Sequence, residues 1–356
     1  MSLRVLRPGL LTTVQDLGRP GHQHEGITVG GAMDPFALRL ANLLVGNDEH
    51  AAALELTLIG PTLRIEADVL LAITGGDLRP VIDDRPVPMW HAVRVRAGAT
   101  LSFRGAASGC RAYLAVAGGI DVPVVLGSRS THLRARFGGL DGRPLREADV
   151  VPLGLPPELS RRLAATIPRT DAPFAVADWL AAGAVLAGYG PNPVLRLLRG
   201  PEFDRLTPAS RERLFGGTFR VAPESDRMGY RLEGPPLEVT DGAEAISEGV
   251  ATGTLQLPPD GTPIALMADR QTTGGYPRIG HVAAIDRPRL AQLRPGDELR
   301  FREIGLAEAQ ARLLAMERAI AMVGEAIRWK VRGAANGSDR AQGESAGGSA
   351  EFRGNA

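Results

Sequence analysis

Short apolar runs, separated by glycine and proline, recur along the whole chain. The runs with the clearest strand pattern are 69–74, 94–96, 100–103 and 111–116 in the first half, and 194–198, 219–221, 264–267 and 299–301 in the second. Alternating or continuous apolar runs that are bounded by turn residues are typical of β-strands. The 44 glycines and 27 prolines supply the turns between them. The pattern therefore predicts a mainly β protein.

Helical signals are confined to a few places. Asp34 and Pro35 open an amphipathic stretch that runs to Leu44, with Asp34 as the N-cap and Pro35 in the first helical position. Thr207 and Pro208 repeat this start signal before residues 209–214. A final alanine-rich stretch, 306–328, has apolar residues at helical spacing. We therefore expect few helices, one of them at the end of the folded chain.

A length of 356 residues is enough for two domains, each with its own core. We place the boundary within the stretch 155–192, which is rich in proline, alanine and leucine. The expected division is an N-terminal β-rich domain over 1–170, a second β domain over 171–305 and a C-terminal helix over 306–332. Residues 333–356 lack apolar periodicity, so this tail is predicted to be disordered.

The composition narrows the classes of function. Hydrophobic residues make up 44% and charged residues 23%, as in ordinary globular proteins. A formal net charge of +1 gives no electrostatic case for nucleic acid or an anionic membrane as partner. No apolar stretch has the length of a membrane span, and residues 1–4 lead into strand-like sequence and not into a signal peptide. We expect a cytoplasmic protein.

Two rare residue types exclude further chemistry. Cys110 is the single cysteine, so an intrachain disulfide and a thiolate metal cluster are both excluded. His22 and His24 lack a third ligand nearby, and we predict no metal site. Lys330 is the sole lysine. Because arginine stays protonated, Schiff-base chemistry in the main fold and a phosphate-binding loop lysine are excluded as well.

The most informative segment is 266–277, where an apolar strand breaks into polar residues and glycines. Its functional side chains are Asp269, Arg270, Gln271, Thr272, Thr273 and Tyr276. A structural turn needs only the glycines and the proline, so these donors and acceptors indicate a surface for a small polar substrate. We predict Asp269, Arg270 and Gln271 as catalytic, with Asp269 as proton acceptor, and the remaining residues as substrate-binding.

Three further residues in the second half extend this site. Asp226 and Arg227 lie beside a glycine and an aromatic residue, and Gln256 lies on a glycine-interrupted strand. Together with the segment 266–277 they supply repeated Asp-Arg pairs and glutamines, groups that bind an amide or carboxylate through charge-assisted hydrogen bonds. The alternative for each Asp-Arg pair is a purely structural contact.

Two motifs in the first half remain open between function and structure. Arg129, Ser130 and Thr131 resemble an oxyanion or carboxylate pocket, and we include them among the substrate-binding residues. The alternative is an N-capped turn with an exposed arginine. In the segment 9–21, Asp16 and Arg19 either contribute to a polar rim, together with neighbouring polar residues, or form a satisfied structural pair.

Several of these motifs, in this order, resemble the KipA family, also called allophanate hydrolase subunit 2 or biotin-dependent carboxyltransferase-like. The matching segments are 9–19, 31–35, 41–47, 118–120, 126–131, 226–232 and 267–277. The resemblance covers residues 3–304. It implies two β-barrel-like domains, the second of them cyclophilin-like.

The same family includes the C subunit of 5-oxoprolinase, so the resemblance also implies a function. That complex uses ATP to open the lactam of 5-oxo-L-proline to L-glutamate, with a KipI-type B subunit, together with a LamB/YcsF-type A subunit. ATP is then a cofactor of the complex. An unstrained amide is a poor electrophile, and phosphorylation of its oxygen supplies a leaving group. An Arg-, Gln- and Thr-rich surface suits an amide or lactam substrate.

Two other functions remain open. In urea carboxylase-type enzymes, similar sequence moves a carboxyl group from carboxybiotin to urea or a similar amide. Biotin would then arrive on another chain, because no Met-Lys-Met surrounds Lys330. The second alternative is a non-catalytic regulator that binds a KipI-type kinase inhibitor.

Overall fold

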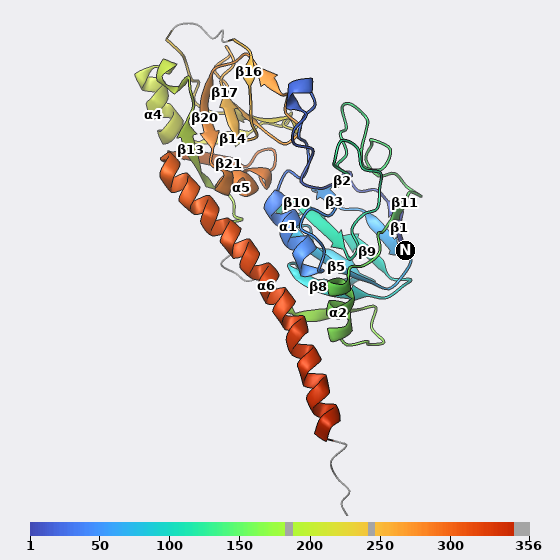
Figure 1. Cartoon of the computed structure of the whole chain (residues 1–356). Coiled ribbons are helices and arrows are strands. Elements are labelled where there is room, and N and C mark those ends of the chain that lie inside the picture. The colour runs from blue at the N-terminus through green and yellow to red at the C-terminus, as the bar shows by residue number, and fades with distance from the viewer. Residues whose placement is uncertain (182–187, 241–245, 345–356) are drawn as a thin grey trace, which may run out of the picture.

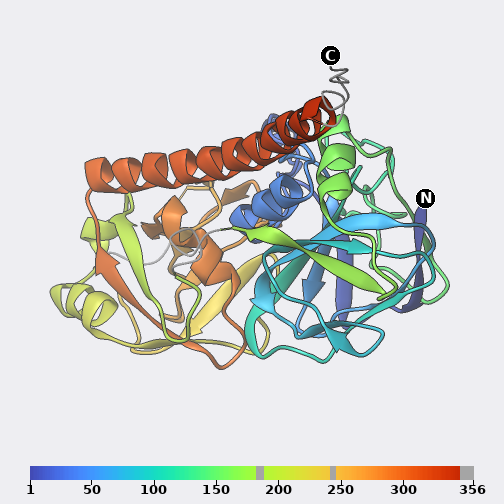
Figure 2. The same cartoon turned by 90° about the horizontal axis from the view of Figure 1, so that it is seen from below.

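The computed structural model describes residues 1–181, 188–240 and 246–344 (Figure 1). Two β-rich units lie side by side, and one long helix runs along both of them, as Figures 1 and 2 show. The mainly β fold class is confirmed, and every strand-like run named above lies in or overlaps a strand.

The first unit contains two antiparallel six-stranded sheets. The first sheet has the order β11 (Val150–Pro152), β1 (Ser2–Arg7), β4 (Thr62–Ile65), β9 (Thr100–Phe103), β6 (Pro80–Ile82) and β7 (Arg85–Pro86). The second has the order β12 (Phe174–Leu180), β8 (His91–Val95), β5 (Val69–Asp77), β10 (Ser108–Val116), β3 (Ala53–Thr57) and β2 (Leu11–Gln15). Leucine, isoleucine and valine side chains of both sheets share one buried core.

The alternation along β3 decides what each face of the second sheet contacts. Leu54 and Leu56 belong to the core shared by the two sheets, whereas Ala53 belongs to the cluster under the helices. Since side chains alternate along a strand, Glu55 lies on the helix side with Ala53. That face is covered by α1 (Pro35–Leu44), which starts as predicted, with the Asp34 side chain accepting from the Ala37 amide at 3.0 Å.

The second unit is a closed barrel, as predicted for this half of the chain. Its strand order is β13 (Val194–Arg199), β20 (Arg278–Val282), β17 (Thr254–Gln256), β18 (Ile264–Leu266), β15 (Gly229–Glu233), β14 (Phe219–Val221) and β21 (Glu298–Glu303). The parallel pair β13–β21 closes it. Outside the barrel, β16 (Glu248–Gly249) pairs with β19 (Thr273–Gly274).

Short helices complete the two units. They are α2 (Glu158–Thr166), α4 (Pro208–Gly216), α5 (Arg287–Ala291) and the 3-10 turns η1 (Gln23–Glu25), η2 (Phe203–Arg205) and η3 (Ala284–Asp286). The start of α4 matches the predicted signal, because the Thr207 hydroxyl accepts from the Ser210 amide at 3.2 Å. Among the described helices none is long and apolar enough to span a membrane.

The last helix, α6 (Leu306–Glu344), is longer than the predicted C-terminal helix over 306–332. It leaves the barrel after β21, passes α1 and reaches α2 (Figures 1 and 2). Arg39 of α1 holds it by a bidentate ion pair to Glu317, at 2.8 and 2.7 Å. The helix continues through residues 333–344, which the sequence indicated as disordered, and the rest of that tail lies outside the described residues.

The position of β12 bears on the division into domains. It pairs with β8 of the first unit, and the barrel strands begin only at Val194. By strand pairing, the first unit therefore extends to Leu180, beyond the boundary at residue 170 that we proposed. The division itself stays a prediction.

Candidate functional site at the seam between the two units

The turn that follows β18 gives its two charged residues different neighbours. The amide of Asp269 donates to the Arg227 carbonyl at 2.8 Å, which holds the Asp269 side chain toward Arg227 and the first unit. Arg270 contacts the barrel instead, where Nε donates to the Val250 carbonyl at 3.2 Å and Nη1 to the Thr252 hydroxyl at 2.8 Å. The predicted catalytic pair is therefore split between two environments.

Arg227, Glu55 and Asp269 form a buried ion-pair network, called the Arg227 network below. Arg227 is 5% exposed and donates two hydrogen bonds to Asp269, from Nε to Oδ2 at 2.8 Å and from Nη2 to Oδ1 at 3.0 Å. Its Nη1 pairs with Glu55 of the first unit. Two carboxylates thus surround one guanidinium at the seam between the units.

The electrostatics of Arg227 follow from this arrangement. Burial opposes its charge, but the charges of Asp269 and Glu55 outweigh burial and raise the pKa of Arg227 above its ordinary value. Glu55 is satisfied on its other side by the Tyr113 hydroxyl at 2.7 Å and the Met33 amide at 2.9 Å. Partners on all sides make this network a rigid joint between the two units.

Arg19 lies at the same seam and is not balanced in this way. Arg19 is 0% exposed, and its Nη2 donates to the Ser130 carbonyl at 2.5 Å. Its Nε and Nη1 are buried and have no hydrogen-bond partner among the described residues. Burial lowers the pKa of Arg19, and the charges of Asp16 and Asp269 offset only part of that effect. Phe137 stacks under the guanidinium, 4.8 Å from ring centroid to Cζ.

The segment 128–130 binds a carboxylate, as its composition suggested, but this carboxylate belongs to the protein. Oδ1 of Asp16 accepts from the hydroxyls of Ser128 at 2.6 Å and Ser130 at 2.5 Å, and Oδ2 from the Arg129 amide at 2.5 Å. The Arg129 side chain turns away to the Val122 carbonyl at 2.9 Å. These contacts fix the loop that carries Arg19.

The third member of that motif is also part of the scaffold. Thr131 is buried, and its hydroxyl donates to the Val14 carbonyl of β2 at 3.0 Å. Ser130 connects the motif to the seam, because its carbonyl accepts a hydrogen bond from Arg19.

Gly30 leaves a space between Arg19 and Asp269. A Cβ at this position would stand 3.4 Å from Nη1 of Arg19 and 3.6 Å from Oδ1 of Asp269, with no other atom within 4 Å apart from its chain neighbours. The backbone there is left-handed, with φ +63°, a conformation that favours glycine. The two charged groups therefore face one small gap from opposite units of the molecule.

The kind of ligand that this gap could bind follows from the hydrogen-bonding groups of Asp269 and Arg19 that have no partner. Both oxygens of Asp269 already accept one hydrogen bond, so each keeps a second lone pair for an N–H donor. Nε and Nη1 of Arg19 keep their N–H groups for an anion. A ligand with a carboxylate at one end and an N–H group nearby would satisfy both.

The other predicted residues of the segment 266–277 lie along the barrel rim. Gln256 is buried, accepts from Gln271 at 3.3 Å and donates to the Tyr276 carbonyl at 3.4 Å. The Thr272 carbonyl accepts from the Val250 amide at 3.0 Å, and Thr273 is exposed on β19. The Tyr276 side chain is 44% exposed. None of these side chains contacts Asp269 through a described hydrogen bond.

Asp226 occupies a turn. Its Oδ1 accepts from the amides of Met228 at 2.8 Å and Gly229 at 3.3 Å, and the residue is exposed. Such a contact is a local Asx turn. The structure brings Arg227 and Asp269 together, therefore, and leaves Asp226 outside the group.

Sequence reasoning missed two residues of the seam. Glu55 stands alone as a charge inside the apolar run 52–58, and a charged residue that interrupts a buried strand is the signal that would have found it. Gly30 has no signal of its own, because its importance comes from two side chains distant in sequence. Arg19 was noted within its motif but was not selected as a site residue.

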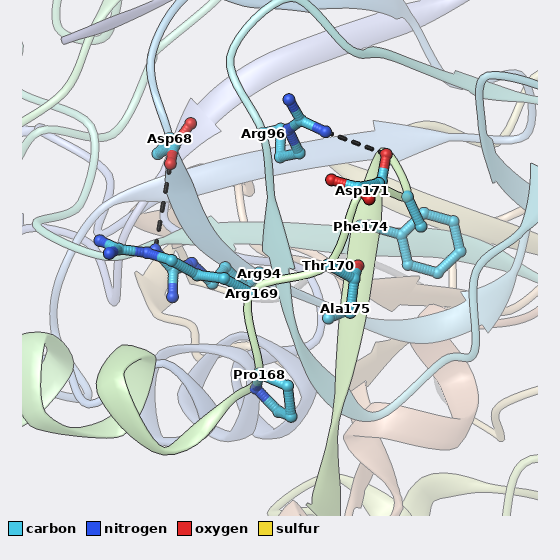
Figure 3. Close-up of a pocket in the computed structure, with 10 residues that line it drawn as sticks. Asp68, Arg94, Arg96, Pro168, Arg169, Thr170, Asp171, Phe174 and Ala175 are labelled. Carbon is cyan, nitrogen blue, oxygen red and sulfur yellow. Dashed lines mark hydrogen bonds and ion pairs between the residues drawn. The ribbon is translucent and has the colours of Figure 1, made fainter.

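A separate pocket opens on the first unit, away from the seam (Figure 3). Arg94 and Arg96 line it with residues 168–175, and Asp68 lies 4.0 Å from Arg94. Nη1 of Arg96 donates to the Asp171 carbonyl at 2.9 Å. The pocket includes none of the predicted site residues. Among the described residues no group of three or more His, Cys, Asp or Glu side chains is arranged to hold a metal.

Comparison with known proteins defines the class. Residues 25–303 match the family described as carboxyltransferase domain, subdomain A and B, and the chain belongs to that family. It is 41% identical to the 5-oxoprolinase C subunit of Escherichia coli over 86% of this chain and 93% of that protein. It is also 38% identical to the 5-oxoprolinase C subunit of Haemophilus influenzae, over 83% of this chain and 89% of that protein.

Larger proteins contain a similar unit. The crystal structure of the Kluyveromyces lactis urea amidolyase aligns with a TM-score of 0.81 and 30% identity, over 90% of this chain and 20% of that chain. The urea amidolyase of Saccharomyces cerevisiae is 32% identical over 84% of this chain and 16% of that protein. This chain therefore spans only a small part of the urea amidolyases.

Proposed function

We propose that this chain is the C subunit of an ATP-dependent 5-oxoprolinase, which hydrolyses the lactam of 5-oxo-L-proline to L-glutamate. The observation that carries the proposal is the 41% identity to the Escherichia coli protein, which extends over 93% of that protein. Similarity over nearly the whole length of both chains favours a common role. The enzyme is then an ATP-hydrolysing amidohydrolase that is assembled from several subunits in the cytoplasm.

The proposed partners are a KipI-type B subunit, together with a LamB/YcsF-type A subunit. ATP acts at the level of the complex, where phosphorylation of the lactam oxygen supplies a leaving group and water opens the ring. The sole lysine of this chain pairs with Asp178, Nζ to Oδ2 at 2.6 Å, and is no part of a phosphate-binding loop. We therefore propose that a partner protein supplies at least part of the ATP site.

In this proposal the gap at Gly30 binds the lactam. Arg19 offers its unpaired Nη1 to the substrate carboxylate, and Asp269 accepts a hydrogen bond from the lactam N–H. Both contacts are charge-assisted and lie in a buried environment, where such hydrogen bonds are strong. The Arg227 network holds Asp269 in place, and the contacts around Asp16 hold the loop of Arg19.

A carboxyltransferase is the second candidate. The matched family is named for a carboxyltransferase domain, and the Kluyveromyces lactis urea amidolyase aligns with a TM-score of 0.81. Urea would offer N–H donors to Asp269, and in this alternative the carboxylate for Arg19 would come from carboxybiotin and not from the acceptor. Biotin would then reach the site on another chain, because the surroundings of Lys330 do not match an attachment site.

Co-expression of the three subunits tests the proposal. The complex is expected to release L-glutamate from 5-oxo-L-proline when ATP is present, whereas this chain alone is expected to release none, with or without ATP. Asp269→Asn removes the negative charge at the gap and should lower kcat/KM by at least about 100-fold. Asp226→Asn changes the Asp of the other Asp-Arg pair, which is exposed, and should leave kcat/KM within about threefold.

The two parts of the proposal fail separately. A complete complex that consumes urea and carboxybiotin but not 5-oxo-L-proline would overturn the assigned reaction. A complex that keeps full activity with Asp269→Asn would leave the reaction in place and overturn the assigned site.

A further inference from the structure

A group of basic residues lies on the barrel side of the turn after β18. It consists of Arg270, His281 of β20 and Arg287 at the start of α5, and is called the basic cluster below. Nη2 of Arg287 donates to Nε2 of His281 at 3.0 Å. Arg270 is 5% exposed, and its charge acts on His281 as that of Arg287 does. The supporting elements β17, β20 and α5 are labelled in Figure 1.

In the part of the chain that the structure describes, no carboxylate pairs with this cluster. Within residues 1–181, 188–240 and 246–344, none of its three members has an acidic side chain within ion-pair distance. Asp286 precedes Arg287 in the chain, but its carboxylate pairs with Arg196 at 2.5 Å and with Arg289 at 3.3 Å. The nearest acidic residue in sequence is therefore committed elsewhere.

The titration behaviour of the cluster reflects the missing counter-charge. Burial lowers the pKa of His281 to about 4, and the charges of Arg287 and Arg270 add to the effect. Burial likewise lowers the pKa of both arginines. His281 is then neutral, with Nε2 accepting from Arg287 and Nδ1 facing the Thr254 hydroxyl at 3.4 Å. It orients Arg287 without adding charge.

The cluster also has unused donors, and the residue beside them is a glycine. Nε of Arg287 is buried and has no hydrogen-bond partner, and no described residue accepts from Nη2 of Arg270. A Cβ at Gly253 would stand 3.0 Å from the Val282 carbonyl oxygen, 3.3 Å from Nε of Arg287 and 3.6 Å from Nε2 of His281. A side chain there would crowd these atoms, and glycine leaves them without a side-chain cover. Arg287 and His281 are both half-buried, which gives the cluster a face toward solvent.

We propose that the basic cluster is a binding site for a phosphate group, in which Arg270 and Arg287 neutralise a dianion. Two guanidinium groups without a counter-charge match a dianion better than a single carboxylate, which would leave one charge unbalanced. Planar guanidinium donors suit the tetrahedral oxygens of phosphate. The source is either free inorganic phosphate or the terminal phosphate of a nucleotide.

This site is independent of the proposed reaction, because it is defined by binding to this chain and not by turnover. Calorimetric titration of the full chain alone with inorganic phosphate at pH 8, against sodium chloride of equal ionic strength, tests it. Saturable binding of one phosphate per chain is expected, and sulfate, also a dianion, should compete. Displacement of phosphate by ATP would assign the site to a nucleotide, and failure of ATP to displace it would assign it to free phosphate.

Variants locate the binding. Arg287→Gln and Arg270→Gln should each weaken phosphate binding at least tenfold. Arg302→Gln removes the same charge from an exposed position of the barrel and should leave binding unchanged. The loss of an unpaired buried charge does not threaten folding, and thermal unfolding of each variant verifies this. Absence of saturable binding, equal binding by all variants, or competition by L-glutamate in place of sulfate would each overturn the proposal.

Discussion

The Arg227 network and the basic cluster lie on opposite sides of one short turn, and they differ in how positive charge is balanced. Arg227 has a carboxylate from each unit of the molecule, Glu55 and Asp269. Among the described residues, Arg270 donates to a carbonyl and a hydroxyl, and the nearby charged group is the positive Arg287. Consecutive residues of the turn thus belong to a balanced group and to an unbalanced one.

The presence or absence of a counter-charge separates charges that stabilise the fold from charges that are available to bind a ligand. A buried ion pair with all its hydrogen bonds made contributes rigidity and loses much when one partner is removed. A buried charge without a partner destabilises the empty protein, and an anion that binds there relieves the cost. Arg19 combines both cases, with one hydrogen bond to Ser130 and two donors left over.

Removal of Arg227 should have the largest effect on stability. Arg227→Met leaves Glu55 and Asp269 buried without the guanidinium that they share. Arg111 lies 3.9 Å from Glu55 and does not replace those hydrogen bonds, so the free energy of unfolding should fall by about 3–5 kcal/mol. Chemical denaturation of the two proteins measures the difference. Arg231→Met is the matched control, because Arg231 is exposed and lies 3.7 Å from Asp260, and it should change stability by less than about 0.5 kcal/mol. A small effect at residue 227 would contradict the balanced network.

Removal of Arg287 should have a smaller effect of opposite sign. Arg287→Met deletes a donor that is buried without a partner, so the free energy of unfolding in phosphate-free buffer should rise by about 1 kcal/mol. The same denaturation experiment measures it. A loss of stability comparable to that of Arg227→Met would show that Arg287 is balanced by a partner after all, and the comparison between the two groups would fail.

The pH dependence of stability gives the smallest and most specific signal. The pKa of His281 is lowered from 6.5 to about 4 by burial and by the charges of Arg287 and Arg270. The unfolded chain therefore binds more protons than the folded chain in this window, and His281 lowers stability as the pH falls from 6.5 to 4.

His281→Gln removes this contribution. The stability of wild type relative to the variant should decrease steadily as the pH is lowered through that window, and it should be constant above it. Other groups that titrate there, such as Asp34, are common to both proteins and cancel in the difference. A difference that does not change with pH would mean that His281 is not held neutral by its neighbours.

The sequence predicted the elements of the fold better than the contacts of the site. The strand runs and the N-caps at Asp34 and Thr207 depend on residues close in the chain, and the structure confirms them. The seam depends on tertiary contacts, in which Glu55 of β3 meets Arg227 of the barrel. No local pattern contains that pairing.

The motif at 128–131 shows that local sequence predicts the kind of group that is bound but not where that group comes from. Its composition indicated a carboxylate pocket, and the hydroxyls of Ser128 and Ser130 do hold a carboxylate. The sequence alone did not reveal that the carboxylate is Asp16 of the same chain. Residue types establish which group is bound, whereas only the fold establishes whether that group is internal or a ligand.

The placement of the substrate is tested most directly by the KM of the three-subunit complex for 5-oxo-L-proline with Arg19→Gln in this chain. Glutamine keeps a polar side chain but removes the charge and the unpaired donor Nη1, which faces the gap at Gly30. Because the substrate carboxylate loses a charge-assisted partner, KM should rise at least about tenfold while the complex stays assembled. An assembled complex with unchanged KM would contradict the placement of the substrate at this seam.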